Sequence, residues 1–243
     1  MAGLEARHLA DLTFPEVSRA LRALSSAYVE RRQKLAEGAA LAGAGKRAAF
    51  ALFYGPLHFL TVNRIVASID GTKAIGDTLV DLGCGTGASG AAWAASCAKP
   101  PALIAIDRNR WALDEAATTF RHFGLKARTE MHDAAAALPT RASAWLAAYA
   151  LNEMDERSRN TLLDRLLERA ALGERVLIIE PVAKSAAPWW KRAAERALAA
   201  GGRADEWSFR VELPPIVEKL DRAAGLNHRE LKARSLYVGR SGL

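Results

Sequence analysis

The sequence predicts an α/β protein, a doubly wound sheet of seven mostly parallel strands that carries an N-terminal helical cap. From Thr78 onward, short apolar runs alternate with helical stretches, which is the pattern of parallel strands joined by crossover helices. The first run leads through a glycine-rich turn directly into a helix. Residues 1–75 precede this run and have helical character, so we expect a cap over 1–75 and a ligand-binding domain over 76–243.

Composition sets the outer limits. With 243 residues, half of them hydrophobic, the chain is long enough for one α/β domain and an appendage. No apolar run reaches membrane-spanning length, and the N-terminus lacks the apolar core of a signal peptide. The two cysteines, Cys84 and Cys97, have no metal-ligand spacing. We therefore expect a cytoplasmic protein with no membrane association and no metal.

The formal net charge of +7 makes a polyanionic partner such as RNA plausible. The alternative is that the arginines, interleaved with acidic residues on Ala-rich helices, form ordinary solvated helix faces. Both interpretations stay open at this point.

The cap begins with a helix that Thr13 caps and that opens at Phe14-Pro15-Glu16. A second helix is expected from Lys46 to Ile69, interrupted at Gly55-Pro56. Its aromatic residues are candidates for the core, but a cap over the ligand site also grips substrate. Tyr54 and His58 are therefore candidate substrate residues.

The glycine turn joins a strand over 78–82 to a helix over 88–98. Glycines permit positive φ and close approach of a ligand, and the helix start offers free N–H groups. Gly85 to Gly90 also fits the dinucleotide pattern G-x-G-x-x-G, with Asp107 at the expected distance. However, Asp81 directly precedes the glycines, and we expect its carboxylate to project into the ligand crevice. There it would repel a pyrophosphate and suit a cationic ammonium group instead.

The run Asp81-Leu-Gly-Cys-Gly-Thr-Gly87 resembles motif I of class I S-adenosylmethionine (SAM)-dependent methyltransferases. The resemblance implies a Rossmann-like fold, SAM as cofactor, S-adenosylhomocysteine (SAH) as product, and methyl transfer as the activity.

The remaining elements follow in chain order. We expect strands over 103–106, 125–131, 144–151, 175–179 and 230–238, with a possible further strand over 209–211. We expect helices over 109–123, 155–172, 188–200 and 214–224.

Polar residues end the successive strands, where ligands bind in an open parallel sheet. Asp107 ends the second strand, and the resemblance implies that it binds the ribose hydroxyls. Asp133 follows the third strand, where the family often places an adenine contact; its alternative role is a helix N-cap. The resemblance thus implies a cofactor site composed of Asp81, Gly83, Cys84, Gly85, Gly87, Asp107, Arg108, Asp133, Ala134 and Tyr149.

The fourth strand leads into Asn152-Glu153-Met154, which departs from the motif of enzymes that methylate exocyclic amines. Asn152 is a candidate for positioning an acceptor and Glu153 for a general base. Equally, Glu153 can stabilise the N-terminus of the next helix, where negative charge is favourable. Trp189 is a candidate lid over the acceptor, although packing is the commoner role of such a residue.

The run from Tyr149 to Met154, together with Leu177 to Pro181 and Trp207 to Phe209, resembles the methyltransferase-like family that attaches to the small ribosomal subunit. Members of that family carry cysteines for a metal site, and this chain has none after Cys97. The expected acceptor is therefore a small molecule, or ribosomal RNA or protein. The alternative function is a non-catalytic ribosome-assembly or RNA-binding factor with the SAM fold.

Overall fold

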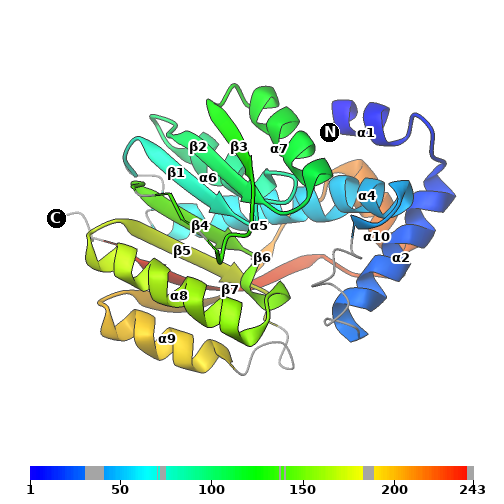
Figure 1. The fold of residues 1–243 in the computed structure, drawn as a ribbon. Helices are drawn as coiled ribbons and strands as arrows, with labels where there is room; N and C mark the ends of the chain where they lie inside the picture. Colours follow the sequence, from blue (N-terminus) through cyan, green and yellow to red (C-terminus); the bar gives the residue numbers. More distant parts are fainter. Residues whose placement is uncertain are drawn as a thin grey trace.

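The computed structural model describes residues 1–30, 41–69, 71, 75–136, 138–139, 141–182 and 189–239. Its strands are β1 (Thr78–Leu82), β2 (Ala102–Asp107), β3 (Ala127–Met131), β4 (Ala144–Ala148), β5 (Arg175–Glu180), β6 (Arg203–Arg210) and β7 (Glu230–Val238). They form a seven-stranded sheet in the order β3-β2-β1-β4-β5-β7-β6 (Figure 1). The strands β1 to β5 pair in parallel, and β7 runs antiparallel to both β5 and β6. The predicted fold class is confirmed.

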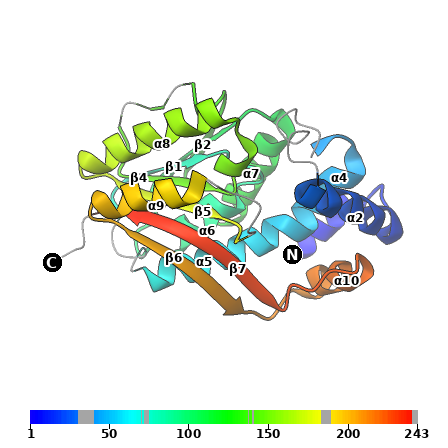
Figure 2. The ribbon, with the colours of Figure 1, turned by 90° about the horizontal axis from the view of Figure 1, so that it is seen from below.

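Helices cover both faces of this sheet. The described α-helices are α1 (Ala2–His8), α2 (Phe14–Glu30), α4 (Ala44–Ala49), α5 (Gly55–Ser68), α6 (Ala88–Ser96), α7 (Arg110–His122), α8 (Glu156–Ala171), α9 (Trp189–Ala199) and α10 (Pro215–Ala223). Apolar residues of α5, α6 and α7 share one core with one face of the sheet, and those of α8 and α9 share another core with the opposite face. Figure 2 shows α8 and α9 on the side of the sheet opposite to α5 and α6. None of the helices in the described part of the chain is long and apolar enough to cross a membrane.

The N-terminal helices divide between two cores. Val62, Ile65 and Val66 of α5 are fully buried in the core that α6 and the central strands build. By contrast, α2, α4 and α10 surround a separate cluster that contains Leu21 and Phe53. The helix α5 is thus a layer of the α/β sandwich, while the helices before it gather beside the sheet, to the right in Figure 1. The domain boundary expected at residue 75 stays a prediction.

Gly55-Pro56 does not break the second N-terminal helix. A π-helical turn, η2 (Phe50–Tyr54), joins α4 to α5, and Pro56 lies in the first turn of α5. Proline lacks an N–H and clashes with the carbonyl four residues back, and widening the preceding turn is one way to accommodate it. The expected interruption is therefore a change of helical pitch.

Two strand predictions were wrong in extent. The strand predicted over 144–151 ends at Ala148, because Tyr149 has a left-handed φ of 60° and a 3₁₀ turn, η3 (Leu151–Glu153), follows. The possible strand over 209–211 is the end of the longer strand β6, whose side chains alternate between partly buried and exposed. Arg203 and Asp205 hide this alternation in the sequence, because these charged residues lie on the same face of β6 as Trp207 and Phe209.

Candidate functional site

The glycine turn connects β1 to α6 at the carboxyl edge of the sheet. Gly83, Gly85 and Gly87 have φ values of 66°, 52° and 73°, a region that side chains other than glycine rarely adopt. A Cβ on Gly83 would lie 2.7 Å from the Ala150 Cβ, and one on Gly87 would lie 2.8 Å from the Phe120 ring. The backbone of this turn is therefore closely packed and needs glycine at these positions.

Asp81 lies beneath this turn and does not project into a crevice as expected. Its side chain is 1% exposed, and its Oδ2 accepts a hydrogen bond of 3.0 Å from the N–H of Gly90. Burial raises the pKa of the Asp81 carboxyl to about 7; the Gly90 N–H opposes the rise, and the charge of Asp107 adds to it. The sequence does contain a signal for this burial, because side chains alternate along a strand. Asp81 therefore shares with Leu79 the face of the sheet that α6 covers.

Asp107 ties the glycine turn to the end of β2. Its Oδ2 accepts a hydrogen bond from the N–H of Gly85 at 2.9 Å, and its Oδ1 accepts one from the N–H of Asn109 at 2.8 Å. A carboxylate has about four acceptor positions, so two further donors can bind to it. The side chain is partly exposed, which leaves it accessible to a ligand.

Asp133 follows β3, and its side chain caps the turn over residues 134–136; the predicted alternative was the N-cap of a helix, and these residues form no helix. Its Oδ1 accepts a hydrogen bond of 2.8 Å from the N–H of Ala135. Its Oδ2 lies 3.8 Å from a guanidinium nitrogen of Arg108. Ala134 is 5% exposed and packs in the core beneath. The adenine contact predicted for Asp133 stays a prediction, since capping occupies only part of the carboxylate.

Cys84 does not present its side chain to the site. It is 6% exposed and belongs to the hydrophobic core formed with α6, and burial raises the pKa of its thiol well above the usual value. Its N–H, like that of Gly83, donates to the carbonyl of Ile106. A cofactor could therefore contact Cys84 only at its backbone, and not at its side chain.

Tyr149 meets the helical segment of the N-terminal region at the end of β4. Its ring stacks on His58 with a centroid distance of 4.0 Å and an interplanar angle of 13°, and its hydroxyl is hydrogen-bonded to Thr61. Burial lowers the pKa of His58 to about 3, so this imidazole is neutral at pH 7. The structure thus brings the predicted residues His58 and Tyr149 together.

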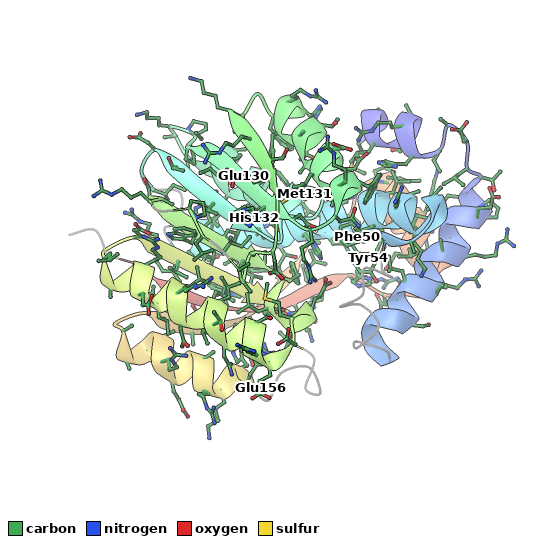
Figure 3. All side chains as sticks on the ribbon, in the orientation of Figure 1. Phe50, Tyr54, Glu130, Met131, His132 and Glu156 are labelled. Atoms are coloured by element: carbon green, nitrogen blue, oxygen red, sulfur yellow. The ribbon has the colours of Figure 1, made fainter. Side chains whose placement is uncertain are left out.

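Phe50 is a member of this ring cluster that the sequence did not single out. Its ring lies 5.9 Å from that of Tyr54 and 6.1 Å from that of His58, measured between centroids. It also lies 3.6 Å from the position of a Cβ on Gly85, so it covers the glycine turn. Figure 3 marks Phe50 and Tyr54 on the helical segment to the right of the sheet. Phe50 and Tyr54 are four residues apart, so the sequence places both rings on one face of a helix. A helix face that packs in the core has the same spacing, so the spacing alone does not identify a site.

Asn152, Glu153 and Trp189 do not form one acceptor surface. Both ends of the Asn152 amide are bound within the protein, since its Nδ2 donates to Glu180 and its Oδ1 accepts a bond of 3.2 Å from the Trp189 indole. The Glu153 carboxyl instead lies within electrostatic range of Asp107 and Arg108. Burial, followed by the charge of Asp107, raises its pKa to about 7, against the opposing effect of Arg108.

The electrostatics of this edge of the sheet favour a cation. Burial is the main cause of the raised pKa of both Asp81 and Glu153, and the charge of Asp107 adds to the rise in each case. Arg108 is the basic group that lowers the pKa of Glu153. Within the part of the chain that the structure describes, no group of three or more His, Cys, Asp or Glu residues is arranged to hold a metal ion. The arrangement fits an organic cation enclosed by the glycine turn.

Comparison with known proteins identifies the fold. No protein-family model matches the sequence, and no curated protein is detectably similar to it. Among solved structures, the mitomycin 7-O-methyltransferase MmcR superposes with a TM-score of 0.56 at 16% identity, over 99% of this chain and 72% of that one. The chain has the fold of class I SAM-dependent methyltransferases. The alignment with MmcR includes the N-terminal helices.

Two further neighbours show how varied proteins of this fold are. Magnesium protoporphyrin IX methyltransferase (ChlM) from Synechocystis PCC 6803, solved with bound SAM, has a TM-score of 0.51 at 14% identity over 91% of this chain and 97% of that one. The [4+2]-cyclase SpnF has a TM-score of 0.51 at 20% identity over 74% and 82%. A fold supports several chemistries, so function has to be argued from the site.

Proposed function

We propose that this protein binds SAM at the carboxyl ends of β1 and β2 and transfers its methyl group to an acceptor. The observation that carries the proposal is the convergence of Asp81, Asp107 and Glu153 around the closely packed glycine turn. SAM bears a sulfonium and an ammonium group, which favour the ionised form of carboxyl groups such as Asp81 and Glu153 whose pKa lies near 7, whereas the pyrophosphate of a dinucleotide would be repelled. Supplying an electrophilic methyl group is the chemistry that SAM brings when it is bound.

Residues of this chain account for binding and alignment. Asp107 has acceptor positions left for the ribose hydroxyls after its bonds to Gly85 and Asn109. Asp81 acts through the turn, since it holds Gly90 at the start of α6 and contributes negative charge beneath the cofactor. Asp133 remains our candidate for the adenine. The rings of Phe50 and His58 exclude water from this edge of the sheet, and methyl transfer to a neutral nucleophile depends mainly on alignment and desolvation.

For the acceptor we favour a small molecule over ribosomal RNA or protein. Several arginines that made a polyanionic partner plausible are engaged within the protein: Arg165 donates to the Ala135 carbonyl, and Arg196 lies 2.6 Å from Asp164. The acceptor side is lined by Tyr54, His58 and Tyr149, which present rings at the sheet edge. A ribosomal substrate would require steeply salt-dependent RNA binding.

Cys84 and Cys97 are both free thiols, in keeping with a cytoplasmic location.

A second candidate is a non-catalytic factor that keeps the SAM fold for binding, or a catalyst of another reaction. The SpnF comparison favours the second of these alternatives, because SpnF shares this fold and is named a cyclase. A measurement of methyl transfer from SAM separates both alternatives from a methyltransferase.

The test is calorimetric titration of the protein with SAM, SAH and NADH. We expect micromolar binding of SAM and SAH and no binding of NADH. The variant Asp81→Asn should weaken SAM more than SAH, because only SAM carries the sulfonium charge. Asp114→Asn, an exposed change on α7, is the matched control and should leave both affinities unchanged. NADH binding without SAM binding would overturn the proposal.

A further inference from the structure

Glu180 is a fully buried carboxylate at the end of β5, with 0% of its surface exposed. One of its oxygens, Oε1, accepts hydrogen bonds from the backbone N–H groups of Leu151 at 2.9 Å and Asn152 at 3.2 Å. Its Oε2 accepts a bond from Nδ2 of the Asn152 side chain. Burying a carboxylate without hydrogen-bond donors costs several kcal/mol of stability. The three donors from one turn offset this cost and tie Glu180 to that turn.

Asn152 extends this network to α9. Its Oδ1 accepts the indole N–H of Trp189, the first residue of α9, at 3.2 Å. The guanidinium carbon of Arg159 lies 5.3 Å from the centre of the Trp189 ring. The end of β5, the turn η3 and the start of α9 are therefore linked through one side-chain amide whose donor and acceptor ends are both used.

The turn that Glu180 holds lies between two residues of the candidate site. Tyr149 precedes it in a left-handed backbone conformation that a tyrosine rarely adopts, and it stacks on His58. Glu153 ends it and lies within electrostatic range of Asp107 and Arg108. Strained conformations persist only where the surroundings fix them. The N–H of Tyr149 donates to the Ile179 carbonyl at 2.8 Å, and Glu180, the next residue of β5, binds Leu151 and Asn152 on the other side.

We propose that Glu180 is a positioning residue: through Asn152 it fixes the turn η3 and so places Tyr149 and Glu153 at the cofactor. This inference rests on the proposed function for its catalytic meaning, since Glu180 touches neither cofactor nor acceptor. It assigns Asn152 to the same network and not to direct contact with an acceptor.

The first test compares Glu180→Gln with Glu206→Gln by hydrogen exchange of the backbone amides in residues 149–154. Glu206 lies opposite Arg234 on β6, as Glu180 does on β5, but it is exposed, and among the described residues its side chain has no hydrogen bond to η3. In Glu180→Gln an NH₂ group replaces Oε2 and meets the NH₂ of Asn152, so one bond of the network must break. We expect exchange at these amides to rise at least about tenfold in Glu180→Gln and to stay unchanged in Glu206→Gln.

The second test is a rescue by the double variant Glu180→Gln with Asn152→Asp. There the introduced glutamine amide donates to one oxygen of the introduced aspartate, while the other oxygen still accepts the Trp189 indole. Every bond of the network then has a donor and an acceptor again. Slow exchange should return, which a role for Glu180 in bulk packing does not predict. Equal exchange in the single and double variants would overturn the proposal.

Trp189→Phe keeps the proposal testable if Glu180→Gln does not fold. It removes the indole N–H together with part of the ring, and we expect a severalfold rise in exchange at residues 149–154. Its matched control is Trp207→Phe, which removes an indole N–H bonded to Ser235 on the opposite face of the sheet and should leave that segment unchanged. Unaltered exchange in Trp189→Phe would show that α9 is not coupled to the turn.

Calorimetry separates this inference from the proposed function. We expect SAM affinity to fall about fivefold in Glu180→Gln and to recover in the double variant. Failure of the wild-type protein to bind SAM would overturn the proposed function alone, because hydrogen exchange still tests the network. Changed exchange with unchanged SAM affinity would limit Glu180 to holding the turn and overturn its role toward the cofactor.

Discussion

Replacing Asp107 by asparagine should damage both the fold and the cofactor site, because this carboxylate joins two turns. Each oxygen accepts one backbone N–H, from Gly85 at 2.9 Å and from Asn109 at 2.8 Å. A hydrogen bond to a charged group contributes roughly 1.5–3 kcal/mol. Asparagine keeps one acceptor oxygen and turns an NH₂ group toward the other N–H. We therefore expect a loss of about 2 kcal/mol in the free energy of unfolding, since the site is partly exposed.

A loss of that size lowers the melting temperature of a chain of this length by roughly 4–8 °C. Differential scanning calorimetry measures it, with Asp114→Asn as control. Asp114 has an exposed i,i+4 ion pair with Arg110, which contributes only about 0.3–0.5 kcal/mol.

The same Asp107→Asn variant should weaken SAM binding by about 1–3 kcal/mol, or roughly five- to 150-fold, because a ribose hydroxyl loses a charged acceptor. Reduced stability with unchanged affinity would show that the ribose binds elsewhere. An unchanged melting temperature would refute the assignment of the two backbone bonds.

Two further predictions concern Asp81 and its surroundings. Gly90→Ala should lower stability by about 1–3 kcal/mol despite the better helix propensity of alanine, since its Cβ would lie 2.5 Å from the Asp81 carboxylate. Gly3→Ala in α1, where a Cβ meets nothing within 4 Å, should be neutral or slightly stabilising in the same thermal melts. The folded-state pKa of Asp81, about 7, lies above the ordinary value for an aspartic acid. The stability that this group contributes is thus present below about pH 4 and is lost as the pH rises through 7. Urea titrations should show this loss between about pH 5 and pH 8, with a shallower slope in Asp81→Asn, and an equal slope in the variant would contradict the buried-acid assignment.

Much of this fold could be predicted because local and global signals agree. The glycine turn after β1, the apolar runs and the polar residue at each strand end all indicate a doubly wound sheet. The resemblance of Asp81 to Gly87 to a known motif then suggested a specific ligand. The close approach of Gly83 to Ala150, and of Gly87 to Phe120, explains why that motif needs its glycines.

Side-chain partners could not be predicted in the same way. The apolar sequence around Tyr149 gives no sign of its left-handed backbone, or of the bonds that Ile179 and Glu180, some 30 residues later, make to Tyr149 and Leu151. Asn152 looked like a group available to an acceptor, but both ends of its amide find partners on other elements. These contacts depend on tertiary structure and leave no periodic signal. The orientation of Asp81 is different, because strand alternation does encode it.

The position of β7 has a consequence for the order in which the sheet assembles. Although β7 follows β6 in sequence, it lies between β5 and β6 and supplies the pairing of β6 within the sheet. During synthesis β6 therefore emerges before β7, the strand that it pairs with. Until β7 emerges, Trp207 and Phe209 of β6 lack the pairing strand beside them. Since contacts between distant segments form slowly, we expect the parallel half of the sheet to form before the pairing of β5 with β7. A nascent chain that stops before Glu230 exposes two strand edges at once, on β5 and β6, and such edges are sites of aggregation.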